Sequence, residues 1–385
     1  GVDIGTHRFE VPWLRFDLIG QTLSNPDNRV KLLKFLLYRD APGDTGARGM
    51  LFCINKNIPA LGPAPVGAAA ASSALAPAPA APQQPAAAQP ATGNTVLQTQ
   101  PDGTNVYGVT ANGVPALSDP KNVAVGPDGR IYVVEGKANR VSVFNADGSF
   151  ALSFGGPGQG NGQFQEPWGL AVAPNGNVYV ADTWNHRIQY FDQNGQFLGT
   201  WGRLGDAKGS TSTDPGVFWG PREIAISPAG EVFVTDTGNK RIQVFGLDGT
   251  FERMFGGAGS GPGQFNEQVG LTLDNQANLW VADTWNQRIQ KLSPNGDPLT
   301  SIPVPSGWES QAVTNKPYIA VDGQGRIFAT FPDQGRLTMF DADGQPIKDL
   351  TLPSGANPVG VAVSPDGRIL VADARGNVVD SLPPP

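Results

Sequence analysis

The sequence predicts an all-β fold, a six-bladed β-propeller, preceded by a small α/β arm and a linker rich in alanine and proline. The chain has 385 residues, of which 50 are glycine and 35 proline and only 16% are charged. This composition suits many short strands joined by tight turns. From about residue 119, an apolar strand–turn–strand unit recurs at steps of 42 to 54 residues. Six four-stranded units of this length indicate a propeller.

The arm, residues 1–57, is expected to hold one helix and one short strand. Asn25 and Pro26 are typical of a helix N-terminus, and one apolar face follows at Leu32, Leu33, Leu36 and Leu37. Residues 50–54 (MLFCI) have the composition of a strand. An arm of this size buries little core by itself. We therefore expect it to dock on another copy of the chain and to build an oligomer or filament.

The linker, residues 58–94, consists mostly of alanine and proline and carries no charge. Proline-rich composition favours an extended polyproline II conformation, which acts as a semi-rigid spacer. We expect a solvated tether between the arm and the propeller, which covers residues 95–385.

Each repeat unit of the propeller contains four predicted strands. In the second unit these are residues 169–172, 178–182, 187–191 and 197–201. The turns between strands contain Asn-Gly or Asp-Gly pairs, such as Asn194-Gly195. Such pairs supply the positive φ angles that tight hairpins require.

An acidic residue ends the second strand of most units, and an arginine follows five residues later. The acidic position holds Glu135, Asp182, Asp236, Asp283, Phe331 and Asp373, and the arginine position holds Arg140, Arg187, Arg241, Arg288, Arg336 and Val378. A carboxylate and a guanidinium placed across one loop form a charge-assisted pair. We predict this structural role for the pairs Asp182–Arg187, Asp236–Arg241 and Asp283–Arg288. A ring of Asp182, Asp236, Asp283 and Asp373 around a cation is the alternative. The first three each have their own arginine and Asp373 has none, and no metal is expected.

The segments VYVADTWNHRIQYF, VFVTDTGNKRIQVF and LWVADTWNQRIQKL closely resemble NHL repeats, as do the connecting loops FGGPGQGNGQFQEPWGLAV and FGGAGSGPGQFNEQVGLTL. The resemblance covers about residues 119–385 and implies six blades around a central channel. Units five and six depart from the pattern at Phe331 and Val378. In the arm, RVKLLKFLLYRD is similar to the segment that follows the membrane domain in large bacterial and archaeal membrane glycosyltransferases that carry NHL repeats.

The last unit ends after its third strand, residues 378–382, so its fourth strand must come from elsewhere. A propeller with a missing strand would expose unpaired backbone edges. Residues 95–99 (TVLQT) lie about as far before Pro120 as other fourth strands lie before their next unit. We predict that this segment closes the last blade.

One face of the propeller gathers the candidate binding residues, because loops between second and third strands share a face with the connectors between blades. The loops contribute Trp184, His186 and Trp285. The connectors contribute a chemically diverse set at one repeated position: Lys121, Trp168, Arg222, Val269, Tyr318 and Val359. Tryptophan with arginine and tyrosine on a concave face suits a protein or glycan partner. Trp201, Trp219 and Trp280 are expected to pack in the interior instead.

Catalytic side chains are scarce in this sequence. His7 and His186 are its two histidines and Cys53 is its single cysteine, which excludes a multi-histidine zinc site and an intrachain disulfide. The glycine-rich loops 155–162 and 256–263 precede strands, whereas phosphate-binding loops precede helices. We therefore expect neither an enzyme nor a cofactor, although a catalytic propeller stays open as a third interpretation.

The charge of the repeat region argues against nucleic acid as a partner. From residue 119 onward there are 19 basic and 27 acidic residues, a net charge of −8, and nucleic acids require a basic surface. The sequence predicts a non-enzymatic, extracytoplasmic binding or assembly module, secreted or at a prokaryotic cell surface. The alternative is the soluble C-terminal domain of a membrane glycosyltransferase that positions a glycan acceptor. Because the chain begins at Gly1 without a methionine, it reads as a processed or excised piece of a longer chain, with room for an upstream signal or membrane anchor.

Overall fold

The computed structural model describes residues 95–385, except 114–115, 206–212, 305 and 313–314, together with strands β1 (Val2–Ile4) and β2 (His7–Phe9). The chain divides into two units, Gly1–Ala76 and Pro77–Pro385. In the first unit, β1 and β2 pair in antiparallel register. The predicted helix and strand of the arm, the linker and the glycosyltransferase-like segment lie outside the described residues.

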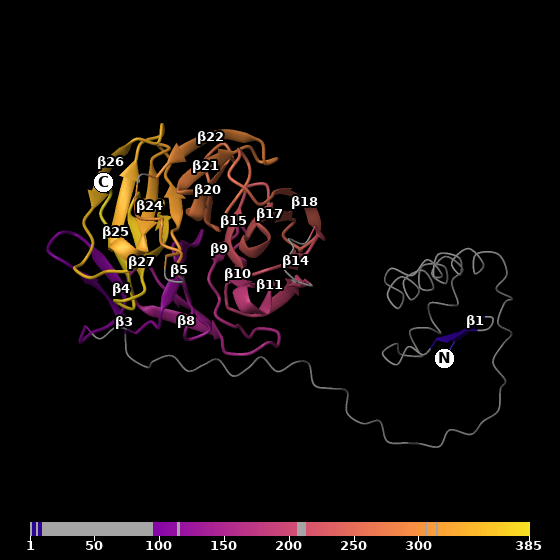
Figure 1. Ribbon diagram of the computed structural model, residues 1–385. Coiled ribbons are helices and arrows are strands. Elements are labelled where there is room, and N and C mark those ends of the chain that lie inside the picture. The colour runs from indigo at the N-terminus through magenta and orange to yellow at the C-terminus, as the bar shows by residue number, and fades with distance from the viewer. Residues whose placement is uncertain are drawn as a thin grey trace, which may run out of the picture. The chain divides into compact units, whose positions relative to one another are not determined.

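The second unit is a six-bladed β-propeller of NHL type, as the sequence predicts (Figure 1). The blades surround a central channel, and the chain runs from the innermost to the outermost strand of each. The first three blades are β5 (Pro120–Val125), β6 (Ile131–Glu135), β7 (Arg140–Phe144) and β8 (Phe150–Gly155); β9 (Leu170–Val172), β10 (Val178–Asp182), β11 (Arg187–Phe191) and β12 (Phe197–Trp201); and β15 (Pro221–Ile226), β16 (Val232–Asp236), β17 (Arg241–Phe245) and β18 (Phe251–Gly256).

The last three blades repeat this order, with one difference in the sixth. They are β19 (Gln268–Leu273), β20 (Leu279–Asp283), β21 (Arg288–Leu292) and β22 (Pro298–Pro303); β23 (Ile319–Val321), β24 (Ile327–Phe331), β25 (Arg336–Phe340) and β26 (Pro346–Leu350); and β27 (Pro358–Val363), β28 (Ile369–Asp373) and β29 (Val378–Leu382), continued by two strands from before the first blade. A short parallel pair, β13 (Arg203–Leu204) and β14 (Val217–Phe218), connects the second blade to the third.

Four blades carry a single 3-10 turn between their second and third strands. These turns are η1 (Thr183–Asn185), η2 (Thr237–Asn239), η3 (Thr284–Asn286) and η4 (Pro332–Gln334). Each ends on a residue with left-handed backbone, such as His186 with a φ of 55° and Lys240 with a φ of 57°. Three of these four left-handed positions hold a residue other than glycine, namely His186, Lys240 and Gln287, so they place side chains in these loops.

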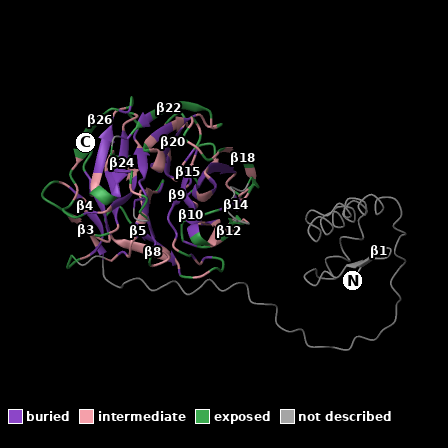
Figure 2. Cartoon of the chain, in the orientation of Figure 1, coloured by how far each residue is buried: buried purple, intermediate pink, exposed green. Residues whose placement is uncertain are grey.

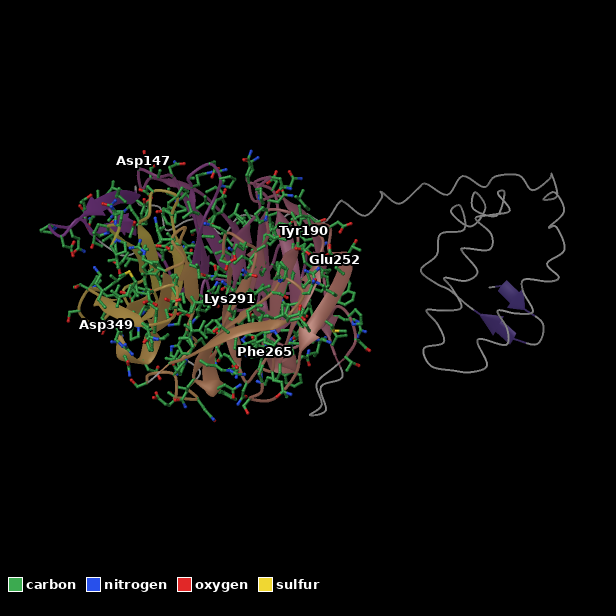
Figure 3. All side chains as sticks on the ribbon, turned by 90° about the horizontal axis from the view of Figure 1, so that it is seen from above. Asp147, Tyr190, Glu252, Phe265, Lys291 and Asp349 are labelled. Atoms are coloured by element: carbon green, nitrogen blue, oxygen red, sulfur yellow. The ribbon has the colours of Figure 1, made fainter. Side chains whose placement is uncertain are left out.

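The apolar core lies between neighbouring blades, because each strand alternates its side chains between the two faces of its sheet. One cluster joins Val134 and Phe154 of the first blade to Val180 and Phe191 of the second. Inner and middle strands are mostly buried, and exposed residues concentrate at turns and outer strands (Figure 2). Side chains from five blades, Asp147, Tyr190, Glu252, Lys291 and Asp349, are distributed around the propeller in Figure 3.

The two glycine-rich loops connect blades and wrap around buried phenylalanines. A Cβ at Gly155 would lie 2.6 Å from the Phe164 ring, and one at Gly256 would lie 2.7 Å from the Phe265 ring. Both glycines have a φ near 105°, which side-chain-bearing residues rarely adopt. Glycine is thus required here by close packing and backbone conformation.

The strand that closes the last blade is β4 (Asn105–Thr110), so the prediction that residues 95–99 do so is wrong. Strand β4 pairs with β29 through Tyr107 and Val379, and β3 (Thr95–Thr99) pairs with the outer edge of β4 as a fifth strand. Both strands lie beside the C-terminal blade in Figure 1. The chain preceding the first blade does close the ring, but the strand that pairs with β29 is the second strand of the β3–β4 hairpin and not the first.

Candidate functional site

The repeated aspartates and arginines form buried pairs inside blades two, three and four. Oδ2 of Asp182 accepts hydrogen bonds from Nε of Arg187 at 2.7 Å and from Nε2 of Gln189 at 3.0 Å, while Oδ1 accepts one from the Gln165 N–H at 2.8 Å. The same bonds recur around Asp236 with Arg241 and around Asp283 with Arg288. Each arginine also donates to two connector carbonyls; Arg241, for example, reaches the oxygens of Asp214 and Val217.

This arrangement joins the second strand, the third strand and the preceding connector of one blade. Burial raises the pKa of Asp182, Asp236 and Asp283, and the hydrogen bonds from amides and arginine oppose that shift. Because the carboxylate oxygens are already occupied by protein donors, these aspartates are placed to hold the blade together.

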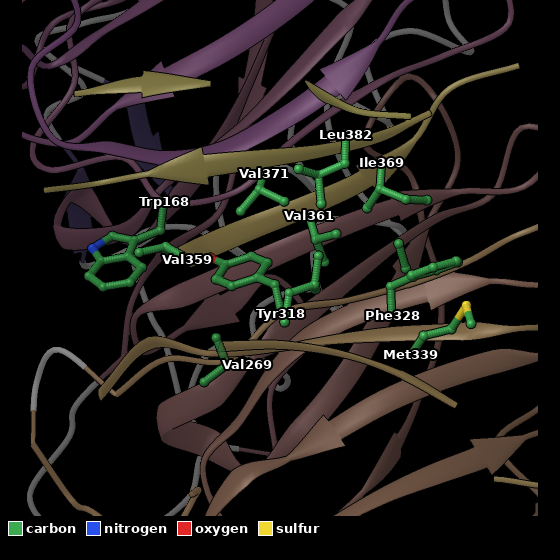
Figure 4. Close-up of a cluster of buried hydrophobic side chains, with 12 residues drawn as sticks. Trp168, Val269, Tyr318, Phe328, Met339, Val359, Val361, Ile369, Val371 and Leu382 are labelled. Carbon is green, nitrogen blue, oxygen red and sulfur yellow. The ribbon is translucent and has the colours of Figure 1, made fainter. Parts of the chain in front are cut away.

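The predicted connector residues converge at one end of the central channel, here called the channel mouth. Trp168, Val269, Tyr318 and Val359, from four different blades, pack in one buried cluster (Figure 4). Above them, Nζ of Lys121 lies 4.4 Å from the Trp168 ring centroid and Cζ of Arg222 lies 4.1 Å from it. These distances are typical of cation–π contacts. Tyr318 is only 2% exposed, so it packs in the buried cluster and is not part of the exposed surface of the mouth.

The loop residues predicted for this face lie around the rim of that cluster. Trp184 is 38% exposed, and its ring centroid lies 5.6 Å from Cζ of Arg222. Trp285 lies under two lysines, with Nζ of Lys240 at 5.2 Å and Nζ of Lys316 at 5.5 Å from its ring.

His186 is held by the backbone beside the rim. Its Nδ1 accepts a hydrogen bond from the Gly220 N–H at 3.2 Å, and burial lowers its pKa. The neutral imidazole is therefore favoured at neutral pH. Among the tryptophans expected to pack inside, Trp280 is buried, whereas Trp219 is 39% exposed beside this loop.

Three acidic residues that sequence reasoning missed complete the rim. Asp119, Glu166 and Glu267 stand two residues before Lys121, Trp168 and Val269, and all three have left-handed backbone with φ between 47° and 58°. Asp119 pairs with Lys121 at 2.9 Å, and Glu166 accepts from the indole N–H groups of Trp168 and Trp184 at 3.2 and 3.0 Å. The signal in the sequence is an acidic residue at a fixed spacing before the variable position.

Glu267 links the two lysines of the rim. Its oxygens pair with Nζ of Lys316 at 2.7 Å and with Nζ of Lys240 at 3.2 Å. Burial alone would raise the pKa of Glu267, but the lysines and Arg222 hold it below its ordinary value. The carboxylate is thus charged at neutral pH.

Below the mouth, the channel forms a partly open cavity of about 340 Å³ lined by the inner strands β5, β9, β15, β19, β23 and β27. Glu223 points into it and accepts two hydrogen bonds from Nδ2 of Asn122, at 3.0 and 2.8 Å. Burial raises the pKa of Glu223 well above its ordinary value.

The described residues contain neither a metal-binding cluster nor a membrane-spanning helix. No group of three or more histidine, cysteine, aspartate or glutamate side chains in the described part of the chain is arranged to hold a metal ion. None of the helices within the described ranges is long and apolar enough to cross a membrane.

The fold is shared with several solved propellers at low sequence identity. A gluconolactonase from Xanthomonas campestris matches with a TM-score of 0.52 and 14% identity, covering 78% of this chain and 97% of that one. A streptogramin B lyase matches with a TM-score of 0.51 and 17% identity, covering 76% and 94%. A chain of the nidogen/laminin complex matches with a TM-score of 0.51 and 15% identity, covering 70% and 97%. At these identities the likeness concerns the fold alone.

A search of curated proteins gave no match. The family model described as NHL repeat matches residues 164–191, 218–245 and 356–377. These segments span the polar pairs of blades two and three and the start of blade six. The chain therefore carries NHL repeats, and it builds them into a six-bladed β-propeller.

Proposed function

We propose that this propeller is a non-enzymatic, extracytoplasmic binding or assembly module whose channel mouth engages a protein or glycan. The observation that carries the proposal is the convergence of Lys121, Trp168, Trp184 and Arg222, from three blades, at one end of the channel. Tryptophan and arginine contribute most of the binding energy in many interfaces.

The contrast between framework and mouth supports this proposal. The polar pairs that hold blades two to four use the same residue types at the same distances. The mouth position, by contrast, differs in chemistry in nearly every blade. A repeated scaffold that presents varied side chains on one face is the arrangement expected of a recognition surface.

The titratable groups near the mouth support binding rather than catalysis. Nδ1 of His186 is occupied by the Gly220 N–H, and Glu223 is engaged by Asn122 behind the buried cluster. A general acid or base has to be within hydrogen-bond reach of a substrate. Nδ1 of His186 is therefore already engaged at the rim, and Glu223 lies in the cavity below it.

Substitution of the rim tryptophans tests the proposal. Binding of the full chain to glycan and peptide arrays is measured and compared with the binding of the Trp184→Ala and Trp285→Ala variants. We expect an at least tenfold loss of affinity in each variant, because about 2 kcal/mol is typical of a truncated aromatic anchor. Ile347→Ala is the matched control, since Ile347 is exposed on the outer strand β26 and its loss should leave binding unchanged.

Two results would contradict the proposal. One is equal binding by wild type and both tryptophan variants, which would place recognition elsewhere. The other is turnover of a printed glycan or peptide that a mouth substitution abolishes, which would indicate an enzyme.

The arm adds a second proposed role, the assembly of copies of the chain into an oligomer or filament. This proposal rests on the small size of the arm and on the alanine- and proline-rich tether behind it. Light scattering of the full chain and of a chain lacking residues 1–94 tests it. A lower mass after deletion is expected, and an unchanged mass would count against assembly through the arm.

A further inference from the structure

Four cations lie over the tryptophans of the mouth, Lys121, Arg222, Lys240 and Lys316, and of these Arg222 alone forms no ion pair with a carboxylate among the described residues. Lys121 pairs with Asp119, and Lys240 and Lys316 both pair with Glu267. Arg222 is 5% exposed, and its Nε and Nη1 are buried without a hydrogen-bond partner among the described residues. Unsatisfied donors on a buried cation are strongly unfavourable. The Arg222 guanidinium therefore lacks a hydrogen-bond acceptor that the described residues do not supply.

The guanidinium keeps its charge in this position. Burial lowers its pKa, and Glu267 and Glu166 oppose that change from a distance. An arginine starts from a pKa so far above neutrality that it stays protonated in proteins. Its planar fork of N–H donors matches the two oxygens of a carboxylate.

The position that would supply the carboxylate is Gly220. Asp119, Glu166 and Glu267 stand two residues before the mouth position of blades one, two and four. In blade three that place is taken by Gly220, which has the same left-handed backbone with a φ of 60°. The third blade thus has the backbone of an acidic rim position but lacks the acid, and it is the blade that presents Arg222.

The space at Gly220 is open to an incoming group. A Cβ added there would have its nearest neighbours at 3.9 Å on Thr183 and at 4.0 Å on Trp184, which are ordinary van der Waals distances. Two partly exposed tryptophans border this space. Trp184 is 38% exposed, and Trp219, the residue before Gly220, is 39% exposed. An occupant of this space would therefore lie against aromatic surface, at the chain position two residues before Arg222.

We propose that the channel mouth recognises an aspartate or glutamate side chain of a protein partner, with Arg222 as its receptor and Gly220 as the gap that admits it. This inference rests on the proposed binding function and names its ligand chemistry. A protein is favoured over a small acidic sugar because small ligands require a concave pocket. The cavity of about 340 Å³ lies below the mouth, and Arg222 does not line it. The surface around Arg222 combines exposed tryptophans with one buried charge, as at protein interfaces.

The test uses the full chain labelled with 15N and two blocked peptides, acetyl-Gly-Glu-Gly-amide and acetyl-Gly-Gln-Gly-amide. The indole N–H signals of Trp168 and Trp184 report on the mouth. We expect both signals to shift saturably with the glutamate peptide, with an affinity at least tenfold higher than for the glutamine peptide. The two peptides have nearly the same shape and differ in charge, so the comparison isolates the carboxylate.

Gly220→Asp supplies a carboxylate within the chain and is the decisive variant. The new aspartate would stand to Arg222 as Asp119 stands to Lys121, so it should compete with the ligand and weaken glutamate-peptide binding at least tenfold. The matched control is Gly216→Asp, which adds the same charge at a glycine with a φ of 68° and open space around its Cβ. Its binding should stay within twofold of wild type. This pair avoids truncating buried Arg222, which could unfold the chain.

Three outcomes would overturn the inference. Equal affinity for the two peptides would show that the carboxylate does not contribute to binding. Unchanged binding of the glutamate peptide by Gly220→Asp would show that Arg222 does not bind its carboxylate. Binding of glucuronate tenfold tighter than the glutamate peptide, with glucose inactive, would replace the protein partner by an acidic sugar. In each case, binding to printed ligands that still depends on Trp184 would leave the proposed function standing, so the two failures are distinguishable.

Discussion

At the scale of single residues, the sixth blade departs from the polar pair that holds blades two to four. In those blades an arginine and a glutamine both donate to the buried aspartate. In blade six the arginine position is Val378 and the glutamine position is Asp380, which pairs across the sheet with Val371. Two acidic residues, Asp373 and Asp380, thus occupy this blade, and the position of the pairing arginine holds a valine. Asp380 is 1% exposed and its Oδ2 has no hydrogen-bond partner among the described residues.

This arrangement predicts that the stability of the propeller falls as the pH rises. Burial raises the pKa of Asp380 to about 7, and the neighbouring Asp373 and Asp102 add to the shift. The folded chain therefore holds this proton more tightly than the unfolded chain, in which the pKa is near its ordinary value. The contribution of Asp380 is fully present below about pH 4 and is lost as the pH rises through about 7. At about 1.4 kcal/mol per pH unit, the loss is on the order of 4 kcal/mol.

Asp380→Asn removes the titrating group and keeps its shape. The variant should be more stable than wild type at pH 8 by a few kcal/mol and nearly equal to it at pH 4, measured by denaturant unfolding at both values. Asp343→Asn is the control, because Asp343 lies in an exposed hairpin turn where substitutions change stability by less than about 0.5 kcal/mol. Parallel pH profiles for wild type and Asp380→Asn would show that Asp380 does not titrate in this range.

At the scale of one element, the fifth blade replaces the polar pair with aromatic packing. Phe331 stands at the aspartate position, and Cζ of Arg336 lies 3.8 Å from its ring centroid. The arginine stacks on this ring and pairs instead with Asp349 of the outer strand, at 3.4 Å. The connector before β23 adds Trp308, which is fully buried and donates from Nε1 to the Thr330 oxygen at 3.1 Å. The Trp308 and Phe331 rings lie 5.7 Å apart. Aromatic contact thus takes the place of the buried carboxylate, while Arg336 still donates to the connector oxygen of Ser306 at 3.3 Å.

Truncation of Trp308 should therefore be among the most damaging single substitutions in the propeller. Trp308→Ala leaves a large cavity between blades four and five and orphans the Thr330 carbonyl, and such changes cost about 3–5 kcal/mol. Trp219→Ala is the matched control, because Trp219 is 39% exposed and should cost less than about half of that. Thermal unfolding of both variants measures the difference. Equal losses would show that Trp308 is not the anchor of the fifth blade.

The fold was predictable because its strands and turns recur in the same order and because an arginine follows the aspartate by five residues in each pair, from Asp182 to Asp283. The closing strand was misassigned because residues 95–99 and 105–110 both have the composition of strands, and chain spacing does not tell which one reaches β29. At the mouth, Lys121, Trp168 and Arg222 were found from their variable chemistry. The rim acids were missed because their role depends on left-handed backbone and on contacts between blades, as Glu267 shows with Lys240 and Lys316. Neither feature is visible in a repeat pattern.

At the scale of the whole molecule, the integrity of the ring depends on a junction between distant parts of the chain. Strand β4 covers the edge of β29, and its residues Val106, Tyr107 and Val109 are buried. The Tyr107 hydroxyl also donates to the Ala146 oxygen of the first blade at 3.2 Å. The junction therefore joins the last blade to the first, and without it β29 would present unpaired backbone groups to solvent.

Two truncations distinguish the closing strand from its outer neighbour. A chain of residues 102–385 loses β3 and keeps β4, and a chain of residues 113–385 loses both. Each of the three buried apolar side chains of β4 contributes about 1.5–3 kcal/mol. The shorter chain should therefore unfold at least ~10 °C below the longer one. It should also aggregate through the exposed β29 edge, as light scattering would show. If the longer chain were already destabilised as much as the shorter one, β3 rather than β4 would hold the ring closed, and the assignment of the closing strand would have to be reversed.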